Sequence, residues 1–500
     1  MTKKILVILS IVFFCFTLSG QIQKNEAPGA DQIKKIPAWK SLGPGGGYVC
    51  DLAVYGKNPD IIYARTFYGL FFKSTNGGKT WVQKSKINEG HYRCTAVDQK
   101  NSNIVYVSGQ DSIFKSKDGG KTWKEHKYLS DSSSQDQEDE IPYLYYRIII
   151  DPLNTQNIYT VGSLNFGYAS SCMAVGKSSD GGETWKITKL NADSDRGMVW
   201  DSSLCQSYPS NIYVAGYYIK GGKQYNVVYG SSNGGGKWKI IGEFDRDITA
   251  VAVNPNDPNN VLVGTLGKVF RTSNGGKSWK EDEDHASSTA FAFNPDNPNI
   301  VYSSSFGSFY KSSNGGRNWN RISPGNIGYC YLLYVIPGAA AQMAGDLATD
   351  DVIYFAGDNG YFKSLDGGLT FDRHCQGMNA ATIDSLTVDP SNALILYAGY
   401  HWYGFFTGKN GGKRWSLTDE FTYGEDIRQI WVNPNNSDDI LVLVRRTSTN
   451  KYLLRSFDHG KNWERIFEED TNCFLVDPND PDVILDFQEL PPSVLLYMPI

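Results

Sequence analysis

Long stretches with the periodicity of an amphipathic helix are missing from this chain of 500 residues. A basic excess is missing too, because 48 Lys and Arg stand against 53 Asp and Glu and the net charge is −5. Nucleic-acid-binding proteins usually carry a basic face, so we expect no nucleic-acid partner. The chain has only 6 His, and no Ser/His/Asp arrangement stands out that would indicate a nucleophilic triad.

Cysteine is scarce, and no C-x-x-C spacing is present among the 8 Cys. Such spacing is typical of zinc sites, so we expect no metal site, and we expect no cofactor. The acidic, Ser-rich segment 130–140 is interpreted as a mobile loop, with a calcium site as the less favoured alternative. Seven Cys follow the first 20 residues, so at least one thiol stays unpaired. Two interpretations remain open: the pairs Cys172–Cys205 and Cys330–Cys375, or buried free thiols.

Beyond the first 20 residues, no stretch is long and apolar enough to cross a membrane. The start of the chain has two lysines, an apolar run from Ile5 to Leu18 and then the small residues Ser19 and Gly20, as at the cleavage site of secretory signal peptides. We therefore expect a secreted protein, extracellular or periplasmic, without a membrane span in the mature chain. Three parts are predicted: a signal peptide at 1–20, a linker at 21–36 and a folded domain at 37–500.

One short pattern is abundant, and it first occurs at Ser74–Trp81 (STNGGKTW). It has a small residue, usually with a hydroxyl group, then Asn or Asp at +2, Gly at +4 and an aromatic residue at +7. Nine copies are present, and eight of the 12 Trp occupy the last position. The Asn and Asp residues of the nine copies are Asn76, Asp118, Asp180, Asn233, Asn274, Asn314, Asp366, Asn410 and Asp458.

Each copy predicts a tight hairpin turn between two short strands. The Asn or Asp side chain can accept hydrogen bonds from backbone N–H groups about two residues on, and the glycines allow positive φ. The aromatic residue opens the return strand and can pack between neighbouring sheets. Because Asn replaces Asp in five copies, the side chain is needed as an acceptor rather than as an acid or a metal ligand. We interpret the nine positions as scaffold.

A strand, a Pro-bearing turn and a second strand also recur, as in Val253–Leu262 and Phe293–Tyr302. Each repeat of about 40–60 residues then contains four short strands, which is typical of a β-propeller blade. The predicted fold is all-β, a single β-propeller of four-stranded antiparallel blades.

Ten blades are predicted from the ends of the chain. Nine turn motifs mark nine blades, and three strand-like segments follow Trp463: Cys473–Val476, Val483–Phe487 and Val494–Met498. The segment Trp39–Leu42 reads as a strand with no blade of its own, so it can complete a tenth blade and close the ring. The alternative is a chain that belongs to a longer tandem propeller.

The turn motif resembles the Asp-box, or BNR, repeat of several propeller families. The predicted count of ten blades resembles the sortilin-type propeller, which implies a wide channel that binds peptides. The photosystem II assembly factor propellers are similar but smaller. Sialidases share the motif, but they carry an R-I-P segment near their start, whereas this chain has only Arg321-Ile322-Ser323.

The amino end resembles the xyloglucan-cleaving family 74 glycoside hydrolases. The resemblance rests on the glycine run Gly45–Gly47 and on Tyr63-Ala64-Arg65-Thr66-Phe67-Tyr68-Gly69, where that family has Y-A-R-T-D-x-G-G. The Asp of this motif is one of the family's two catalytic carboxylates, and Phe67 takes its position here. Inverting hydrolysis needs both carboxylates, about 6.5–9.5 Å apart, so this loss should remove most activity. The family also carries two seven-bladed propellers, for which this chain is too short.

Propeller ligands usually sit at the loop-lined mouth of the central channel. For each aromatic residue there, packing against a neighbouring blade is an equal alternative to ligand binding. The candidate ligand-binding residues in the variable loops are Arg65, Phe67, Tyr68, Tyr217, His401, Trp402 and Tyr403.

We therefore expect a non-catalytic, monomeric protein that binds a peptide, a protein or a glycan at the channel mouth. The alternative function is a glycoside hydrolase related to family 74 with its carboxylates in other loops, for which Asp111 and Asp358 are the candidates. A third interpretation is a structural part of a larger surface complex.

Overall fold

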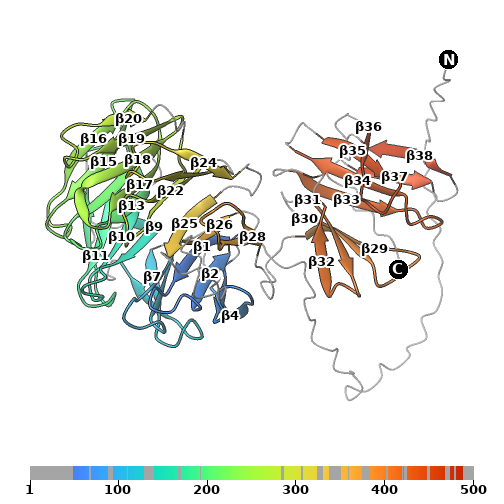
Figure 1. The fold of residues 1–500 in the computed structure, drawn as a ribbon, viewed down its shortest axis with the longest axis horizontal. Helices are drawn as coiled ribbons and strands as arrows, with labels where there is room; N and C mark the ends of the chain where they lie inside the picture. The colour runs from blue at the N-terminus through green and yellow to red at the C-terminus, as the bar shows by residue number, and fades with distance from the viewer. Residues whose placement is uncertain are drawn as a thin grey trace, which may run out of the picture. The chain divides into compact units, whose positions relative to one another are not determined.

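The computed structural model describes residues 49–487, and all its regular elements are strands (Figure 1). The expected signal peptide, linker and closing strand Trp39–Leu42 lie outside this part, as does Val494–Met498. The described residues contain no helix that could span a membrane. Within this range, the structure does not describe residues 67–68, 88–93, 110, 129–139, 167–169, 192, 283–286, 306–307, 324–329, 337–350, 358–359, 374–382, 401–403, 419–420, 422–424, 447–450, 468–472 and 478–479.

Ten antiparallel sheets follow one another along the chain, as the repeats predict. The first is β1 (Val49–Val54), β2 (Ile62–Thr66), β3 (Leu70–Ser74), β4 (Val82–Lys86). The second is β5 (Thr95–Val97), β6 (Val105–Ser108), β7 (Ser112–Ser116), β8 (Lys124–Lys127). The third is β9 (Glu140–Ile150), β10 (Ile158–Phe166), β11 (Ser170–Ser178), β12 (Lys186–Lys189). The fourth is β13 (Arg196–Leu204), β14 (Ile212–Lys220), β15 (Lys223–Ser231), β16 (Lys239–Phe244).

The fifth sheet is β17 (Ile248–Asn254), β18 (Asp257–Thr265), β19 (Lys268–Thr272), β20 (Lys280–Asp282). The sixth is β21 (Ala290–Phe293), β22 (Val301–Ser305), β23 (Ser308–Ser312), β24 (Asn320–Ser323). The seventh is β25 (Cys330–Ile336), β26 (Val352–Gly357), β27 (Gly360–Ser364), β28 (Asp372–Arg373). The eighth is β29 (Ile383–Val388), β30 (Leu396–Tyr400), β31 (Gly404–Lys409), β32 (Arg414–Leu417). The ninth is β33 (Asp426–Val432), β34 (Ile440–Arg445), β35 (Lys451–Ser456), β36 (Glu464–Phe467), and the tenth is β37 (Cys473–Asp477), β38 (Asp480–Phe487).

The turn motif joins the third and fourth strands of a sheet through side-chain hydrogen bonds to the backbone. In the first copy, the N–H of Gly78 donates to Ser74 Oγ at 2.9 Å, and the N–H of Thr80 donates to Asn76 Oδ1 at 2.9 Å. The acceptor therefore reaches four residues on, two further than the sequence predicts. Gly77 and Gly78 have φ of 66° and 84°, a region that glycine enters at little cost.

The copy at Asn410 departs from this pattern. It begins with Gly408, which has no hydroxyl group to accept a turn N–H. Asn410 itself takes a φ of 54°, and the strands stay paired down to Lys409 and Arg414. The missing hydroxyl group is thus accompanied by a shorter connection between β31 and β32.

In most sheets the first strand leads into a Pro-bearing turn, but the turn Asp98–Ile104 of the second sheet contains no Pro. In the sixth sheet, Asn294 Oδ1 accepts hydrogen bonds from the N–H groups of Asp296 and Asn297, both at 2.9 Å. The N–H of Asn294 donates to the carbonyl of Ile300 at 3.0 Å, which pairs the two strands across the turn. The Asn-Pro pair therefore fixes the turn locally, as Asx turns do.

Neighbouring sheets pack through aromatic side chains of the third strand and of the turn motif. Phe71 of the first sheet meets Trp123 of the second edge to face, with ring centroids 5.0 Å apart. The same contact joins Phe405 of the eighth sheet to Trp463 of the ninth, at 5.1 Å. The aromatic residue of the motif thus buries its ring between sheets.

The first seven sheets close into a ring. β1 packs against β25 and β26, and Leu52 and Val54 share one buried cluster with Val352 and Tyr354. Lys363 Nζ of the seventh sheet donates to the carbonyl of Gly77 in the first sheet at 3.3 Å. The same type of bond joins consecutive sheets elsewhere, as from Lys115 Nζ to the carbonyl of Gly181 at 2.7 Å.

The expected single ring of ten blades is therefore corrected to a ring of seven sheets, followed by three more. The repeats set the number of sheets, but each sheet offers similar apolar faces to its neighbours, so the repeats do not show where the ring closes. We call the eighth to tenth sheets, β29–β38, the three-sheet array. Its last sheet has two strands in the described part of the chain.

The cysteine pair Cys172–Cys205 is also corrected, because both side chains are buried free thiols. Cys50 and Cys94 are buried free thiols as well. The Cys330 side chain and Cys375 lie outside the described part of the chain, as does the strand 2–strand 3 loop with Asp358.

Candidate ligand-binding site

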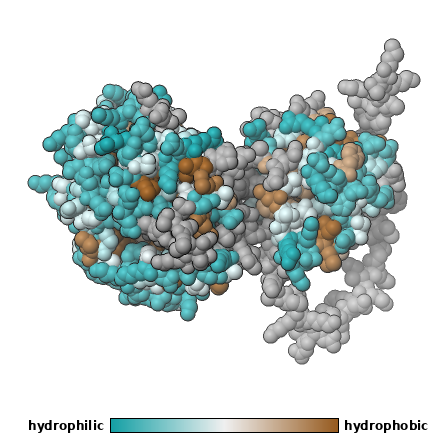
Figure 2. Space-filling model, in the orientation of Figure 1, coloured by the Kyte–Doolittle hydropathy of each residue, from teal (hydrophilic) through white to brown (hydrophobic). Residues whose placement is uncertain are grey.

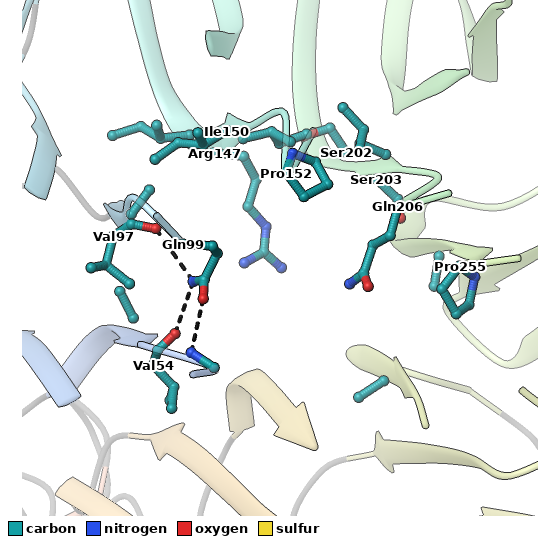
Figure 3. A pocket seen from close by; sticks show the side chains of 18 of the residues that line it. Val54, Val97, Gln99, Arg147, Ile150, Pro152, Ser202, Ser203, Gln206 and Pro255 are labelled. Carbon is teal, nitrogen blue, oxygen red and sulfur yellow. Dashed lines mark hydrogen bonds between the residues drawn. The ribbon is translucent and has the colours of Figure 1, made fainter. Parts of the chain in front are cut away.

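The first strand of each sheet is the inner strand of the ring, and these inner strands enclose a cavity of about 720 Å³ (Figure 3). β1, β5, β9, β13, β17 and β21 contribute its walls, and the Pro-bearing turns that follow them contribute Pro152, Pro255 and Pro295. Because the inner strands are buried between neighbouring sheets, their side chains are mostly apolar. Polar side chains in the wall therefore stand out.

Arg147 on β9 extends its guanidinium group into this cavity (Figure 3). Its Nε donates to Asp201 Oδ1 of β13 at 2.9 Å. Burial works against the charge of Arg147, but the carboxylates of Asp201 and Asp51 outweigh it and hold the pKa above its usual value. The guanidinium group stays charged and is oriented by Asp201.

Asp51 on β1 is a buried carboxyl group in the same cavity wall. Burial raises its pKa to about 7, although the charge of Arg147 and the backbone N–H of Thr95 both favour the ionised form. The Thr95 N–H donates to Asp51 Oδ2 and ties β1 to β5. A carboxyl group with a pKa near neutrality is a candidate for acid–base chemistry, so its surroundings decide its role.

The position of Asp51 is a recurrent link between sheets. It follows a β-bulge in the inner strand, and Asp201, Ser385 and Gln429 follow the same kind of bulge in other sheets. The N–H of Val251 in the next sheet donates to Asp201 Oδ2 at 2.9 Å. Ser385 Oγ and Gln429 Nε2 donate to carbonyl groups of the following sheet at 2.8 and 2.7 Å. This recurrence favours a structural role for Asp51 and Asp201.

Trp200 is the bulge residue of β13, immediately before Asp201, and 41% of its surface is exposed. Its ring lies beside the half-buried ring of Tyr217 on β14, with centroids 6.1 Å apart and planes tilted by 37°. We call these two residues the Trp200–Tyr217 pair. An exposed tryptophan on an inner strand offers a flat apolar face, which suits a sugar ring or an apolar side chain.

The structure places three of the residues that the sequence singled out. Arg65 is fully buried and donates from Nη1 to the carbonyl of Ser108 at 2.9 Å, so its side chain presents no surface to a ligand. Asp111 is half-buried, and its main-chain carbonyl accepts from the N–H of Tyr128 at 3.0 Å. Tyr217 belongs to the exposed pair. Phe67, Tyr68, Asp358, His401, Trp402 and Tyr403 lie outside the described residues.

Trp200, Arg147 and Asp51 were missed at the level of sequence. One signal was available, because Trp200 is one of four Trp that no turn motif uses. No three His, Cys, Asp or Glu side chains among the described residues gather as a metal ion would require. The nine Asn and Asp residues of the motifs likewise lie in hairpin turns.

Comparison with solved structures identifies the fold. No family model matches the chain, and no curated protein matches its sequence. Among solved structures, the chain is similar to an ancestral GH74 enzyme, with 16% identity and a TM-score of 0.62 over 90% of this chain and 67% of that one. It is also similar to YCF48 bound to D1 peptide, with 13% identity and a TM-score of 0.41 over 64% of this chain and 93% of that one.

PorZ, a bacterial surface component of the type-IX secretion system of Porphyromonas gingivalis, is similar at 12% identity and a TM-score of 0.45, over 87% of this chain and 55% of that one. The chain thus spans about two thirds of the ancestral GH74 enzyme and about half of PorZ. The likeness to the GH74 enzyme agrees with the strands and sheets of this structure, and the chain is a β-propeller protein.

Proposed function

We propose that the protein binds a peptide, protein or glycan ligand on the Trp200–Tyr217 pair at the propeller channel, without catalysing a reaction. The observation that carries this proposal is the exposed Trp200 ring on an inner strand, where most apolar side chains are buried. The flat face of the Trp200 ring offers apolar contact to a sugar ring or an apolar side chain, as aromatic residues do in many binding sites.

The carboxylates beside Arg147 favour binding over catalysis. Asp51 accepts the N–H of Thr95, and Asp201 accepts Arg147 Nε and the N–H of Val251. A pair of catalytic carboxyl groups must be free to give and take protons on either side of the bond that is cleaved. Phe67 also replaces the Asp of the family 74 motif.

Replacing Trp200 with Ala is expected to weaken ligand binding at least tenfold, about 1.4 kcal/mol, because central aromatic contacts often dominate an interface. Affinity would be measured on glycan and peptide arrays and then in solution. Tyr208→Ala is the matched control, since Tyr208 is an exposed aromatic residue of the same sheet in a Pro-bearing turn. Equal losses for both variants, or no loss for Trp200→Ala, would remove the pair from the site.

A glycoside hydrolase is the second candidate, because the fold resembles a GH74 enzyme and Asp51 has a pKa of about 7. Assays for released sugars in the same array wells separate the two functions. Sugar products that disappear in Asp51→Asn would establish hydrolysis and assign Asp51 to it. Products that persist in that variant would direct attention to Asp111 and Asp358, through the pH–rate profiles of their Asn variants.

We also propose that the protein is secreted, extracellular or periplasmic, as the pattern of residues 1–20 indicates. Amino-terminal sequencing of the exported protein is expected to show a start just after Gly20. An exported chain that retains Lys3 and Lys4, or a chain that stays in the cytoplasm, would contradict the assignment.

A further inference from the structure

One guanidinium group faces the channel cavity with donors that the protein does not use. Arg147 Nε donates to Asp201 Oδ1 at 2.9 Å, and this is its only hydrogen bond within the described part of the chain. The two terminal nitrogens, Nη1 and Nη2, point into the cavity (Figure 3). The Arg147 side chain is 28% exposed, so a molecule in the cavity can reach it. Because polar groups in a protein wall are normally paired, two unpaired donors that face a cavity are available to a ligand.

The two glutamines of the cavity wall differ in this respect. Gln99 donates to the carbonyl groups of Val54 and Val97 at 3.1 and 3.3 Å (Figure 3). Its own carbonyl oxygen accepts a backbone N–H at 2.8 Å, so its amide is used within the ring. Gln206 lies in the Pro-bearing turn of the fourth sheet, and its amide points into the cavity without a hydrogen bond to any described residue (Figure 3). The amide of Gln206 therefore adds a second available donor to that of Arg147.

Most of the cavity wall is apolar. The inner strands contribute side chains such as Ile148, Phe291 and Phe293, and the turns contribute prolines such as Pro152 and Pro255. By contrast, most of the described residues on the outer face shown in Figure 2 are hydrophilic. Small-molecule sites of about 300–1,000 Å³ combine an apolar wall with a few polar groups, and the cavity of about 720 Å³ lies in this range. The cavity is thus suited to a small, largely apolar molecule with one polar end.

The charges around Arg147 limit what this polar end can be. Two terminal N–H groups of a guanidinium group match the two oxygens of a planar carboxylate. Asp201 and Asp51 already lie near the guanidinium group, and Asp296 is a further, exposed acid of the wall. A phosphate monoester carries about −1.5 to −2 charges at pH 7, and these acids would repel it more strongly than a single carboxylate. A singly charged carboxylate therefore fits the site better.

We propose that the channel cavity binds a small organic acid, with its carboxylate paired to Nη1 and Nη2 of Arg147. Asp201 holds the guanidinium group at Nε and so orients the two terminal nitrogens. The amide of Gln206 supplies a further N–H donor, and the apolar part of the acid lies against the apolar wall. The proposal does not rest on the Trp200–Tyr217 pair, because neither residue lines the cavity.

Asp51 should make the binding of an acid depend on pH. Its carboxyl group lies near the charges of Arg147 and Arg65, and burial raises its pKa to about 7. The neighbouring Cys94 thiol stays neutral, because burial raises its pKa as well. Below pH 7 the protonated Asp51 does not compete with a ligand for Arg147, whereas above pH 7 its negative charge repels a bound carboxylate. The affinity for the acid is therefore expected to fall as the pH rises through 7.

Isothermal titration calorimetry of the full chain tests the proposal with benzoate, phenylacetate and hexanoate, each compared with its uncharged amide. At pH 6, we expect an acid to bind with a Kd below about 1 mM and its amide to bind at least tenfold more weakly. Arg147→Lys keeps a charge beside Asp201 but loses the paired N–H groups, so it should weaken binding of the acid about tenfold. Arg246→Lys is the matched control, since Arg246 is exposed and does not line the cavity, and it should bind the acid as the wild type does.

Two further variants test the site without removing the bond between Arg147 and Asp201. Gln206→Ala, in an exposed turn, is expected to weaken binding of the acid about fivefold, as the loss of one hydrogen bond would. The affinity of the wild type should fall about tenfold between pH 6 and 8, whereas that of Asp51→Asn should stay constant.

Three results would overturn the proposal: no binding of any of the three acids up to about 10 mM, amides that bind as tightly as the acids, or unchanged binding of the acid by Arg147→Lys. A fall in affinity that persists in Asp51→Asn would overturn the part assigned to Asp51.

Discussion

Gly120→Ala is expected to lower the free energy of unfolding by about 2–5 kcal/mol, although it adds one methyl group. Gly120 has a φ of 87°, where an L-residue costs about 1–2 kcal/mol. An added Cβ would lie 2.4 Å from Phe71 Cε1 and 2.8 Å from Cδ1. Phe71 is fully buried and held edge-on by Trp123, so it cannot move aside cheaply. Crowding a packed core in this way costs a further ~1–3 kcal/mol.

The matched control is Gly222→Ala, in the turn between β14 and β15. Gly222 has a φ of 76°, but an added Cβ would meet nothing within 4 Å. This variant should therefore show the backbone cost alone, about 1–2 kcal/mol. Urea unfolding of both variants gives the two losses. Equal losses of unfolding free energy would show that close packing at the junction between the first two sheets contributes nothing to stability. A larger loss for Gly120→Ala would show that close packing at this junction contributes the difference.

The sheets could be predicted from the sequence because their signals are local. The serine and asparagine of a turn motif contact backbone groups within four residues, so the pattern itself contains the turn. The Pro-bearing turns are equally local. Ten sheets in ten repeats follow directly from these two signals.

The closure of the ring could not be predicted in the same way. It depends on Leu52 meeting Val352, 300 residues apart in the sequence, and on a bond from Lys363 to Gly77. A valine or leucine on an inner strand looks the same whether a neighbouring sheet covers it or not. Leu52 and Leu386 illustrate this, because they occupy corresponding positions and only the first is buried.

The candidate site was predicted in part. Tyr217 was singled out because the sequence placed it in a polar, aromatic loop between two strands, whereas the structure places it within β14. Asp51, Arg147 and Asp201 were missed because each stands alone in an apolar strand, and they meet only when the first, third and fourth sheets assemble. Trp200 reads as a core residue until the bulge of β13 shows it exposed.

The stability of the ring should also depend on the protonation of Asp51. Burial raises the pKa of this carboxyl group from 3.8 to about 7, so the native state keeps a proton that the unfolded state has lost between these values. The free energy of unfolding therefore falls as the pH rises from about 4 to 7, by about 4 kcal/mol in all from this group. Above pH 7 both states are ionised and the contribution no longer changes.

Asp51→Asn is expected to remove this contribution, because an amide does not titrate and its oxygen can still accept the Thr95 N–H. The difference in unfolding free energy, wild type minus variant, should thus decrease between pH 4 and 7 and be constant above. Urea unfolding at several pH values measures it.

Asp458→Asn provides a control of opposite sign. The backbone N–H and side chain of Asn462 lower the pKa of Asp458 to about 2. Its ionised form therefore stabilises the fold above pH 3.8, and this contribution is lost as the pH falls through about 2. The difference in unfolding free energy between wild type and variant should then change below pH 4 for Asp458→Asn. For Asp51→Asn it should change between pH 4 and 7. If the difference for Asp51→Asn stays constant from pH 4 to 7, the carboxyl group is ionised over this whole range. The charge of Arg147 would then outweigh burial in setting the pKa of Asp51.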